Sequence, residues 1–231
     1  SQTKTIYMTS FMRDLYANIP NVGIRKLNSA YAVGGGPLLV STIESNYRVD
    51  IDNYASVDFS SMANIIDLVG GVDLEVSTQE AGYINMYLDE QCRLQGLNAS
   101  DYYVTGGGIT HLNGNQAVGF ARIRYTSRGN EHSDYGRTSR QREILVQLMQ
   151  KARSLDATTL LAVVNNMLPL ITHNIDAATL TTLIANAPSY INYDIQTDRI
   201  PYDGLYSNLG EELVPDFEAT INRLHQTIYG N

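Results

Sequence analysis

Four segments of the chain carry the pattern of hydrophobic and polar positions that is typical of β-strands. Residues 4–11 (KTIYMTSF) are rich in β-branched and aromatic side chains and alternate between polar and apolar positions. The other three segments are residues 54–59, 72–76 and 194–200. A polar turn, Met12-Arg13-Asp14, ends the first segment, and a Tyr-rich loop follows the last. The predicted strands are therefore spread along the chain.

Helical periodicity fills much of the chain between and after these strands. Pro37 follows three glycines and opens a helix to about residue 46, because proline is favoured at the first helical position. Ser60 caps a second helix, which Gly70 and Gly71 end near residue 69. The clearest amphipathic pattern covers residues 138–152, with an apolar face of Ile144, Leu145, Leu148 and Met149. Further helices are predicted at residues 80–88, 157–170, 177–187 and 216–229.

Strands and helices interleave over the whole chain, without an internal repeat or an obvious linker. Residues 116–125 change from a helical to an extended pattern, and residues 126–136 read as a loop rich in Gly, Ser, Asn and Asp. A chain of 231 residues is short enough for one core. We therefore predict a single α/β domain over residues 1–231, with helices on both faces of a mixed central sheet.

Composition narrows the class of protein further. A net charge of −8 argues against general nucleic-acid binding. Cys92 is the single cysteine, which excludes an intrachain disulfide and a Cys-rich metal site. The chain holds no apolar run of ~18 residues and no signal-peptide pattern. Because it begins at a polar strand edge without Met, we expect it to be part of a longer protein with a membrane anchor before residue 1.

The basic residues are unusual in type and in placement. Thirteen of the 16 are Arg, and six of these lie between Arg122 and Arg142. The guanidinium group is planar, permanently charged and suited to bidentate contacts with phosphate or carboxylate. An acidic chain that gathers arginines in one segment is thus a candidate for binding a localised anion. A solvated basic helix face is the alternative.

Two motifs within this segment sharpen the hypothesis. Arg122 and Arg124 are predicted on a strand, where residues two apart share a face, so their like charges favour an anion between them. Arg137 is predicted at the N-terminus of the following helix and Gln141 one turn later on the same face. A bound diphosphate would account for a cation at that helix end, and Asp134 would partly neutralise the cluster in its absence. Exposed surface arginines remain the alternative for the first motif.

A third motif, Arg13-Asp14, follows the first strand. Open α/β sheets place ligand groups just outside the carboxyl ends of their strands, which makes Arg13 a candidate for the same site. An Arg–Asp ion pair that holds a turn is the simpler explanation when the motif is taken alone.

Several common catalytic patterns are missing from the sequence. Neither Gly-rich run is followed by Gly-Lys-Ser/Thr, so there is no P-loop, and no Gly-x-Ser-x-Gly elbow is found. The histidines lack metal-ligand spacing; they are His111, His132, His173 and His225. Metal-binding carboxylates cannot be selected from 24 acidic residues. Read from its residues alone, the sequence predicts an arginine-built polyphosphate site on an α/β domain.

The sequence resembles the LytR-CpsA-Psr family over nearly its whole length. The resemblance rests on five blocks that follow one another in the family's order. They are Arg13-Asp14 after a strand, residues 26–31 (KLNSAY) before a Gly-rich turn, residues 67–72 (DLVGGV), residues 111–117 (HLNGNQA) running into 121–124 (ARIR), and residues 134–141 (DYGRTSRQ).

The resemblance implies a phosphotransferase on the extracytoplasmic face of the bacterial cell membrane. Such an enzyme moves a glycopolymer, for example teichoic acid or capsule precursor, from a polyprenyl-pyrophosphate carrier to peptidoglycan, with the lipid in an apolar tunnel. By the same resemblance, the pyrophosphate-binding and catalytic side chains are Arg13, Arg122, Arg124, Arg137 and Gln141. We add Arg140 and Asp134 to the predicted substrate-binding set. A divalent cation, Mg²⁺ or Mn²⁺, is expected, but the family's aspartates lie before residue 1, so its ligands are unknown.

Two other functions are compatible with the same residues. A pyrophosphatase or phosphodiesterase would use the arginine cluster with water as the nucleophile. A non-catalytic module would bind polyprenyl phosphate or the wall polymer and localise other enzymes. A transferase differs from a hydrolase in admitting a sugar hydroxyl and excluding water, and an enzyme differs from a binder in completing a metal site.

Overall fold

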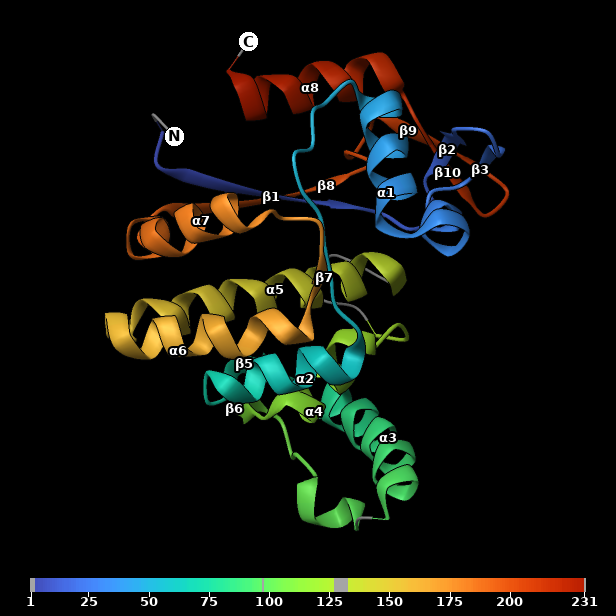
Figure 1. Ribbon diagram of the computed structural model, residues 1–231. Coiled ribbons are helices and arrows are strands. Elements are labelled where there is room, and N and C mark those ends of the chain that lie inside the picture. The colour runs from blue at the N-terminus through green and yellow to red at the C-terminus, as the bar shows by residue number, and fades with distance from the viewer. Residues whose placement is uncertain (1–2, 97, 127–132, 231) are drawn as a thin grey trace. The chain divides into compact units, whose positions relative to one another are not determined.

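The computed structural model describes residues 3–96, 98–126 and 133–230 (Figure 1). Its contacts divide the chain into two compact units. The first unit comprises Ser1–Ser56, His173–Asp176 and Asp194–Asn231, and the second comprises Val57–Thr172 and Ala177–Tyr193. A single domain over residues 1–231 stays a prediction. Residues 127–132, part of the predicted 126–136 loop, lie outside the described residues.

Most of the strands lie in the first unit. The strands β1 (Thr5–Phe11) and β8 (Asp194–Ile200) pair in parallel, from Thr5 opposite Asp194 to Phe11 opposite Ile200. Both were predicted, because their alternation is sustained over seven residues. Two antiparallel hairpins were not predicted. They are β2 (Tyr16–Ile19) with β3 (Gly23–Lys26), and β9 (Tyr206–Leu209) with β10 (Glu212–Pro215).

The first unit also contains the helices α1 (Asn28–Tyr47) and α8 (Phe217–Tyr229). The sequence placed the start of the first helix at Pro37, but α1 begins nine residues earlier, at Asn28. Gly34 and Gly35 interrupt it, and Gly35 has φ +61°, a conformation that favours glycine. The prediction therefore found the straight second part of a kinked helix. The helix predicted at residues 216–229 is present as α8, and Asp216 caps it by accepting a hydrogen bond from the Ala219 N–H.

Helices dominate the second unit, around one antiparallel strand pair, β5 (Val72–Val76) with β6 (Gly108–Leu112). The helices are α2 (Phe59–Leu68), α3 (Thr78–Gln95), α4 (Gly114–Arg122), α5 (Ser133–Arg153), α6 (Ala157–Met167) and α7 (Ala177–Tyr190). Its short 3₁₀ turns are η1 (Ala99–Tyr102) and η2 (Leu168–Leu170). Of the two-residue strands, β4 (Ala55–Ser56) belongs to the first unit, and β7 (Thr172–His173) has one residue in each unit.

Two predicted boundaries in this region were wrong. The strand predicted at residues 54–59 is reduced to β4, and α2 already begins at Phe59. Its cap is Asp58, not Ser60, because the Asp58 carboxylate accepts a hydrogen bond of 2.8 Å from the Ser61 N–H. Aromatic and β-branched residues just before the start of α2 gave this segment a composition typical of a strand.

The core of the second unit positions the helices that carry charged side chains. Buried residues of β5 and β6, such as Leu74 and Leu112, pack with α3 and α4 residues such as Ile84 and Phe120. Ile144 of α5 joins the same core. The helices α3, α4 and α5 are thus held in place around the β5–β6 strand pair.

The predicted α/β class is confirmed: the described strands include the parallel pair β1–β8 and three antiparallel pairs, β2–β3, β5–β6 and β9–β10. Within the described part of the chain, each sheet has two strands. No described helix is long and apolar enough to cross a bilayer. The first unit holds a largely apolar cavity of about 380 Å³, lined by Tyr7, Thr9, Phe11, Ile43, Val49, Asp50, Ile51, Leu224, Ile228 and Tyr229. An apolar tunnel for a lipid stays a prediction.

Asp73 of β5 forms a charged contact that joins three elements of the second unit. Its Oδ1 lies 2.8 Å from Nδ1 of His111 on β6, and its Oδ2 lies 2.5 Å from Nζ of Lys151 on α5. The hydrogen bond from Lys151, and after it the bond with His111, lowers the pKa of Asp73. Asp73 therefore stabilises the fold above the unfolded-state pKa of aspartate, and this contribution is lost as the pH falls through the lower folded-state pKa.

We expect Asp73→Asn to unfold at lower denaturant concentration than the wild type at pH 7. The difference in unfolding free energy should shrink as the pH falls from about 5 to about 3. Denaturant unfolding across that range measures it. Glu75→Gln, an exposed position on the same strand, is the matched control. A gap between Asp73→Asn and wild type that stays constant with pH would contradict the assignment.

Candidate functional site

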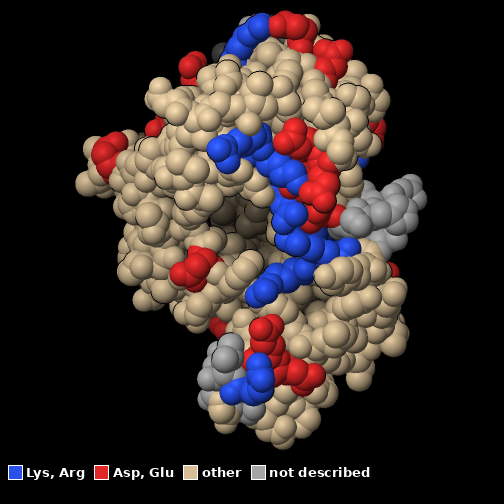
Figure 2. Space-filling view, turned by 90° about the vertical axis from the view of Figure 1, so that its right-hand side faces the viewer, with Lys and Arg blue, Asp and Glu red and all other residues tan. Residues whose placement is uncertain are grey.

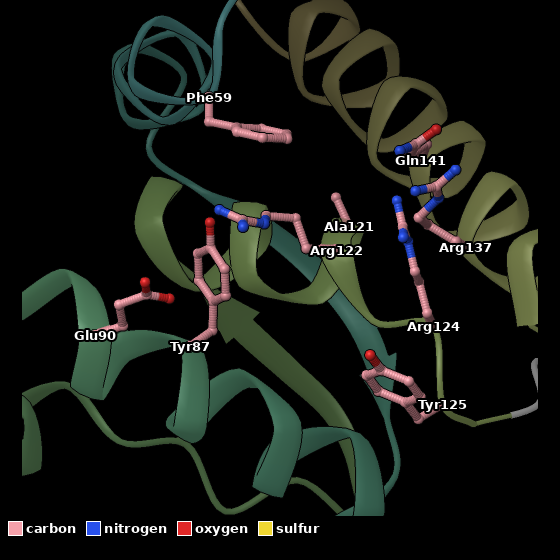
Figure 3. Close-up of a pocket in the computed structure, with 9 residues that line it drawn as sticks. All are labelled: Phe59, Tyr87, Glu90, Ala121, Arg122, Arg124, Tyr125, Arg137 and Gln141. Atoms are coloured by element: carbon pink, nitrogen blue, oxygen red, sulfur yellow. The ribbon is translucent and has the colours of Figure 1, made fainter. Parts of the chain in front are cut away.

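A cavity of about 510 Å³ in the second unit brings most of the predicted arginines together (Figure 3). Its lining comes from α2, α3, α4, α5 and the segment after α4. The lining residues are Phe59, Tyr87, Glu90, Ala121, Arg122, Arg124, Tyr125, Arg137 and Gln141. Four of these were predicted as site residues from the sequence: Arg122, Arg124, Arg137 and Gln141.

Arg13 lies in the first unit, whereas the cavity is lined by the second unit alone. The Nε of Arg13 donates a 3.1 Å hydrogen bond to the adjacent Asp14, and Asp14 also pairs with Lys26 at 3.5 Å. The ion pair considered from the sequence is therefore present. A role for Arg13 in binding the same anion stays a prediction.

The predicted geometry of Arg122 and Arg124 was wrong in one respect. Arg122 is the last residue of α4, not part of a strand, and the extended backbone begins only at Ile123, with ψ 128°. The two side chains consequently do not run parallel. Figure 3 shows the Arg122 guanidinium directed toward Phe59 and Tyr87, and Arg124 directed toward Arg137 and Gln141. Both still reach the cavity, one from each side.

Arg122 is held between two aromatic rings. Its guanidinium carbon lies 3.8 Å from the ring centroid of Tyr87 on α3 and 4.7 Å from that of Phe59 on α2. Partial burial, and after it the charge of Arg124, lowers the pKa of Arg122, but a guanidinium stays charged at neutral pH. No carboxylate among the described residues forms an ion pair with it. Arg122 is therefore a positioned cation whose charge is not neutralised by the described part of the protein.

Arg124 and Arg137 converge on one carboxylate. Oδ1 of Asp134 lies 3.0 Å from Nη2 of Arg137 and 3.6 Å from Nε of Arg124. Helix α5 begins at Ser133, so Arg137 lies one turn inside the helix and not at its N-terminus, as the sequence had suggested. The helix dipole consequently adds little at Arg137, and its charge is balanced by Asp134. These ion pairs agree with the prediction that Asp134 partly neutralises the arginine cluster.

The structure places Arg140 away from the cavity lining. Its side chain is 0% exposed, and its Nε donates a 2.9 Å hydrogen bond to Glu80 of α3, which is itself 2% exposed. Its other two nitrogens donate to the carbonyl oxygens of Ile123 and Thr126. Arg140 is therefore not among the lining residues, and this geometry does not support its predicted direct contact with substrate.

Sequence reasoning missed the aromatic and acidic part of the lining. Phe59, Tyr87, Glu90 and Tyr125 were not among the predicted site residues. Tyr125 is largely exposed and its ring pairs with that of Tyr83, centroid to centroid 6.1 Å. The sequence contains the capping motif Ser77-x-x-Glu80, but it does not indicate that Arg140 is the buried partner of Glu80.

The described residues do not form a metal site. Among them, no group of three or more His, Cys, Asp or Glu side chains is close enough to hold a metal ion. Glu90 lines the cavity as a separate carboxylate, and Asp134 is already engaged by two arginines. Binding of Mg²⁺ or Mn²⁺ stays a prediction.

Charged side chains of both signs gather on part of the surface (Figure 2). In the face shown in Figure 2, Lys and Arg side chains lie next to Asp and Glu side chains, and most of the remaining described surface is uncharged. Fold and cavity together define an α/β protein with an arginine-lined, aromatic-walled cavity. The chain belongs to the LytR_cpsA_psr family, whose model matches residues 1–224.

Curated relatives carry two kinds of name. The regulatory protein MsrR of Staphylococcus aureus (strain COL) is 33% identical over 150 residues, which are 64% of this chain and 39% of MsrR. The polyisoprenyl-teichoic acid–peptidoglycan teichoic acid transferase TagU of Oceanobacillus iheyensis is 32% identical over 241 residues, covering 99% of this chain and 67% of TagU. The match to TagU of Enterococcus faecalis covers 49% of that protein. The chain thus spans between about two fifths and two thirds of these relatives.

Solved structures share the fold at lower identity. TagT bound to LIIa-WTA superposes with a TM-score of 0.73 at 20% identity, covering 99% of this chain and 80% of TagT. TagV of Bacillus subtilis gives a TM-score of 0.68 at 23% identity, covering 98% and 83%. The family protein YwtF (TagT) with bound octaprenyl pyrophosphate lipid gives 0.66 at 20% identity, covering 97% and 79%.

Proposed function

We propose that this domain transfers a glycopolymer from a polyprenyl-pyrophosphate carrier to peptidoglycan. The observation that carries the proposal is the cavity itself, where Arg122, Arg124 and Arg137 converge with Gln141 against a single lining carboxylate, Glu90. Such an excess of positive charge fits a ligand with several negative charges close together, as a diphosphate has. The names of the TagU relatives and the lipid bound to YwtF support the same substrate class.

The proposed reaction is a phosphoryl transfer. The oxygen of an acceptor sugar hydroxyl forms a bond to the phosphorus nearest the polymer, and the bond from that phosphorus to the bridging oxygen breaks. The bridging oxygen leaves with the lipid phosphate, and the hydroxyl proton is released to the medium. The part of the protein is to hold the diphosphate and to neutralise charge on its oxygens, which the arginines and the Gln141 amide can do from fixed positions.

The arginines divide this task according to their surroundings. Arg122 meets the ligand with its charge not neutralised, whereas Arg124 and Arg137 must exchange Asp134 for a phosphate oxygen. The ligand therefore competes with an internal carboxylate at one side of the cavity only. Dependence on Mg²⁺ or Mn²⁺, attachment to a membrane and an extracytoplasmic location remain parts of the proposal.

Binding followed by product analysis tests the function. A short-chain polyprenyl pyrophosphate is titrated into the protein with and without Mg²⁺, and a lipid-linked polymer is then incubated with a peptidoglycan fragment. We expect binding that Mg²⁺ strengthens and polymer attached to the fragment. Release of the polymer as a free phosphate ester, without attachment to the fragment, would instead identify a hydrolase. Binding without any product would identify a binding module, and no binding would refute the proposed site.

A further inference from the structure

Arg140 and Glu80 form a buried ion pair that the proposed reaction does not use directly. Both side chains are almost wholly removed from solvent, and the Arg140 guanidinium also lies over the buried Phe120 ring, 5.7 Å from its centroid. Removing two charges from water is costly, and an apolar pair of similar volume would often be as stable. A buried pair of this kind is therefore expected to have a further structural role.

The N-terminal cap of α3 holds the Glu80 side chain independently of Arg140. It is the third residue of α3, and its Oε2 accepts hydrogen bonds of 2.9 Å from both the N–H and the hydroxyl of Ser77. The other oxygen, Oε1, receives Nε of Arg140. The carboxylate is thus divided between the helix cap and the arginine. Rotation of either side chain would leave a buried charged group without its partner.

The remaining nitrogens of Arg140 hold a short segment of backbone, residues 123–126, that follows α4. Nη1 donates to the Ile123 carbonyl at 3.3 Å and Nη2 to the Thr126 carbonyl at 3.1 Å. The Thr126 hydroxyl in turn donates to the Gln79 side chain at 3.1 Å. The two residues between these anchored carbonyls are Arg124 and Tyr125, and both line the cavity.

We infer that Arg140 is a positioning residue, which fixes the 123–126 segment and through it directs Arg124 at the anion. This inference rests on the proposed function, since it assigns Arg124 to diphosphate binding. Only a planar guanidinium can span the carboxylate and two carbonyls at once, because its donors point in fixed directions. A lysine at this position would keep the charge opposite Glu80 but could not hold both ends of the segment.

A double-mutant cycle tests whether Arg140 acts through Arg124. The variants are Arg140→Lys, Arg124→Ala and the double substitution, and the measurement is titration with the short-chain polyprenyl pyrophosphate. We expect Arg140→Lys to weaken binding several-fold in the wild-type background and to have no further effect beside Arg124→Ala. Leu160→Ala, which removes buried volume from α6 but no residue of the cavity lining or of the core around β5 and β6, controls for a general loss of stability and should leave the affinity unchanged.

Amide hydrogen exchange of the same proteins gives a readout that does not depend on a ligand. Arg140→Lys should speed exchange at Arg124, Tyr125 and Thr126 more than elsewhere in the second unit. Equal weakening of binding in both backgrounds, or unchanged exchange in the 123–126 segment, would overturn the inference while leaving the proposed function intact. If the wild type itself fails to bind the pyrophosphate, the proposed function fails, and the exchange data alone then decide whether Arg140 positions the segment.

Discussion

Arg122→Ala should lower the affinity for a short-chain polyprenyl pyrophosphate by roughly 10- to 100-fold, the loss expected for a hydrogen bond to a charged group. The side chain is already partly desolvated and ordered between Tyr87 and Phe59 in the free protein. Binding therefore costs little further loss of hydration or rotamer freedom at this position. Because no described carboxylate has to be displaced, nearly the whole interaction contributes to affinity.

The neighbouring arginines should show smaller effects. Arg124→Ala and Arg137→Ala each remove a guanidinium that Asp134 partly neutralises, so part of what is lost on substitution is the pairing with Asp134 and not the pairing with the ligand. Titration calorimetry of the three variants at one salt concentration gives the order directly. A ranking with Arg122→Ala as the mildest of the three would contradict the electrostatic picture.

Two further variants sharpen the Arg122 test. Arg122→Lys keeps the charge but loses the planar stacking and the paired donors, so it should recover only part of the affinity. Arg93→Ala removes an exposed arginine from α3, outside the cavity lining, and should bind like the wild type. Wild-type affinity in Arg122→Ala would show that the diphosphate binds elsewhere.

The sequence could predict the members of this cluster that lie close together in the chain. Arg137 and Gln141 are four residues apart on one helix, and the period of the α-helix is enough to place them on one face. Arg140 is adjacent to Gln141 in sequence, yet it lies about 100° away around the helix and points into the core. Composition could not separate these two neighbours, because the difference lies in what packs against each side of α5.

The aromatic walls of the cavity were beyond sequence reasoning for a different reason. Phe59 and Tyr87 belong to α2 and α3, far along the chain from Arg122, and reach it only because the helices pack around the β5–β6 strand pair. The two short hairpins of the first unit were missed similarly. Strands of four residues with few buried apolar positions carry too little periodicity to be recognised.

Gly114→Ala should lower the unfolding free energy by roughly 3 kcal/mol or more, at the upper end of the usual cost of overpacking. A Cβ at this position would lie 2.0 Å from the Ala63 carbonyl oxygen and 2.5 Å from its carbon. These are backbone atoms of α2, so no side-chain rotation can relieve the overlap. The Gly114 N–H also donates a 2.7 Å hydrogen bond to Asp67 of α2, which separation of the helices would break.

Gly82→Ala is the matched control, because Gly82 lies inside α3 with nothing within 4 Å of an added Cβ. It should raise stability by about 0.5–1 kcal/mol through helix propensity. Denaturant unfolding of both variants compares the two glycines, and equal stability of Gly114→Ala and wild type would contradict the close helix contact. The glycine also bears on the site, since α4 runs from Gly114 to Arg122 and α2 carries Phe59. Moving the two helices apart would separate the Arg122 cation from one of its rings, so Gly114→Ala should weaken pyrophosphate binding as well, whereas Gly82→Ala should not.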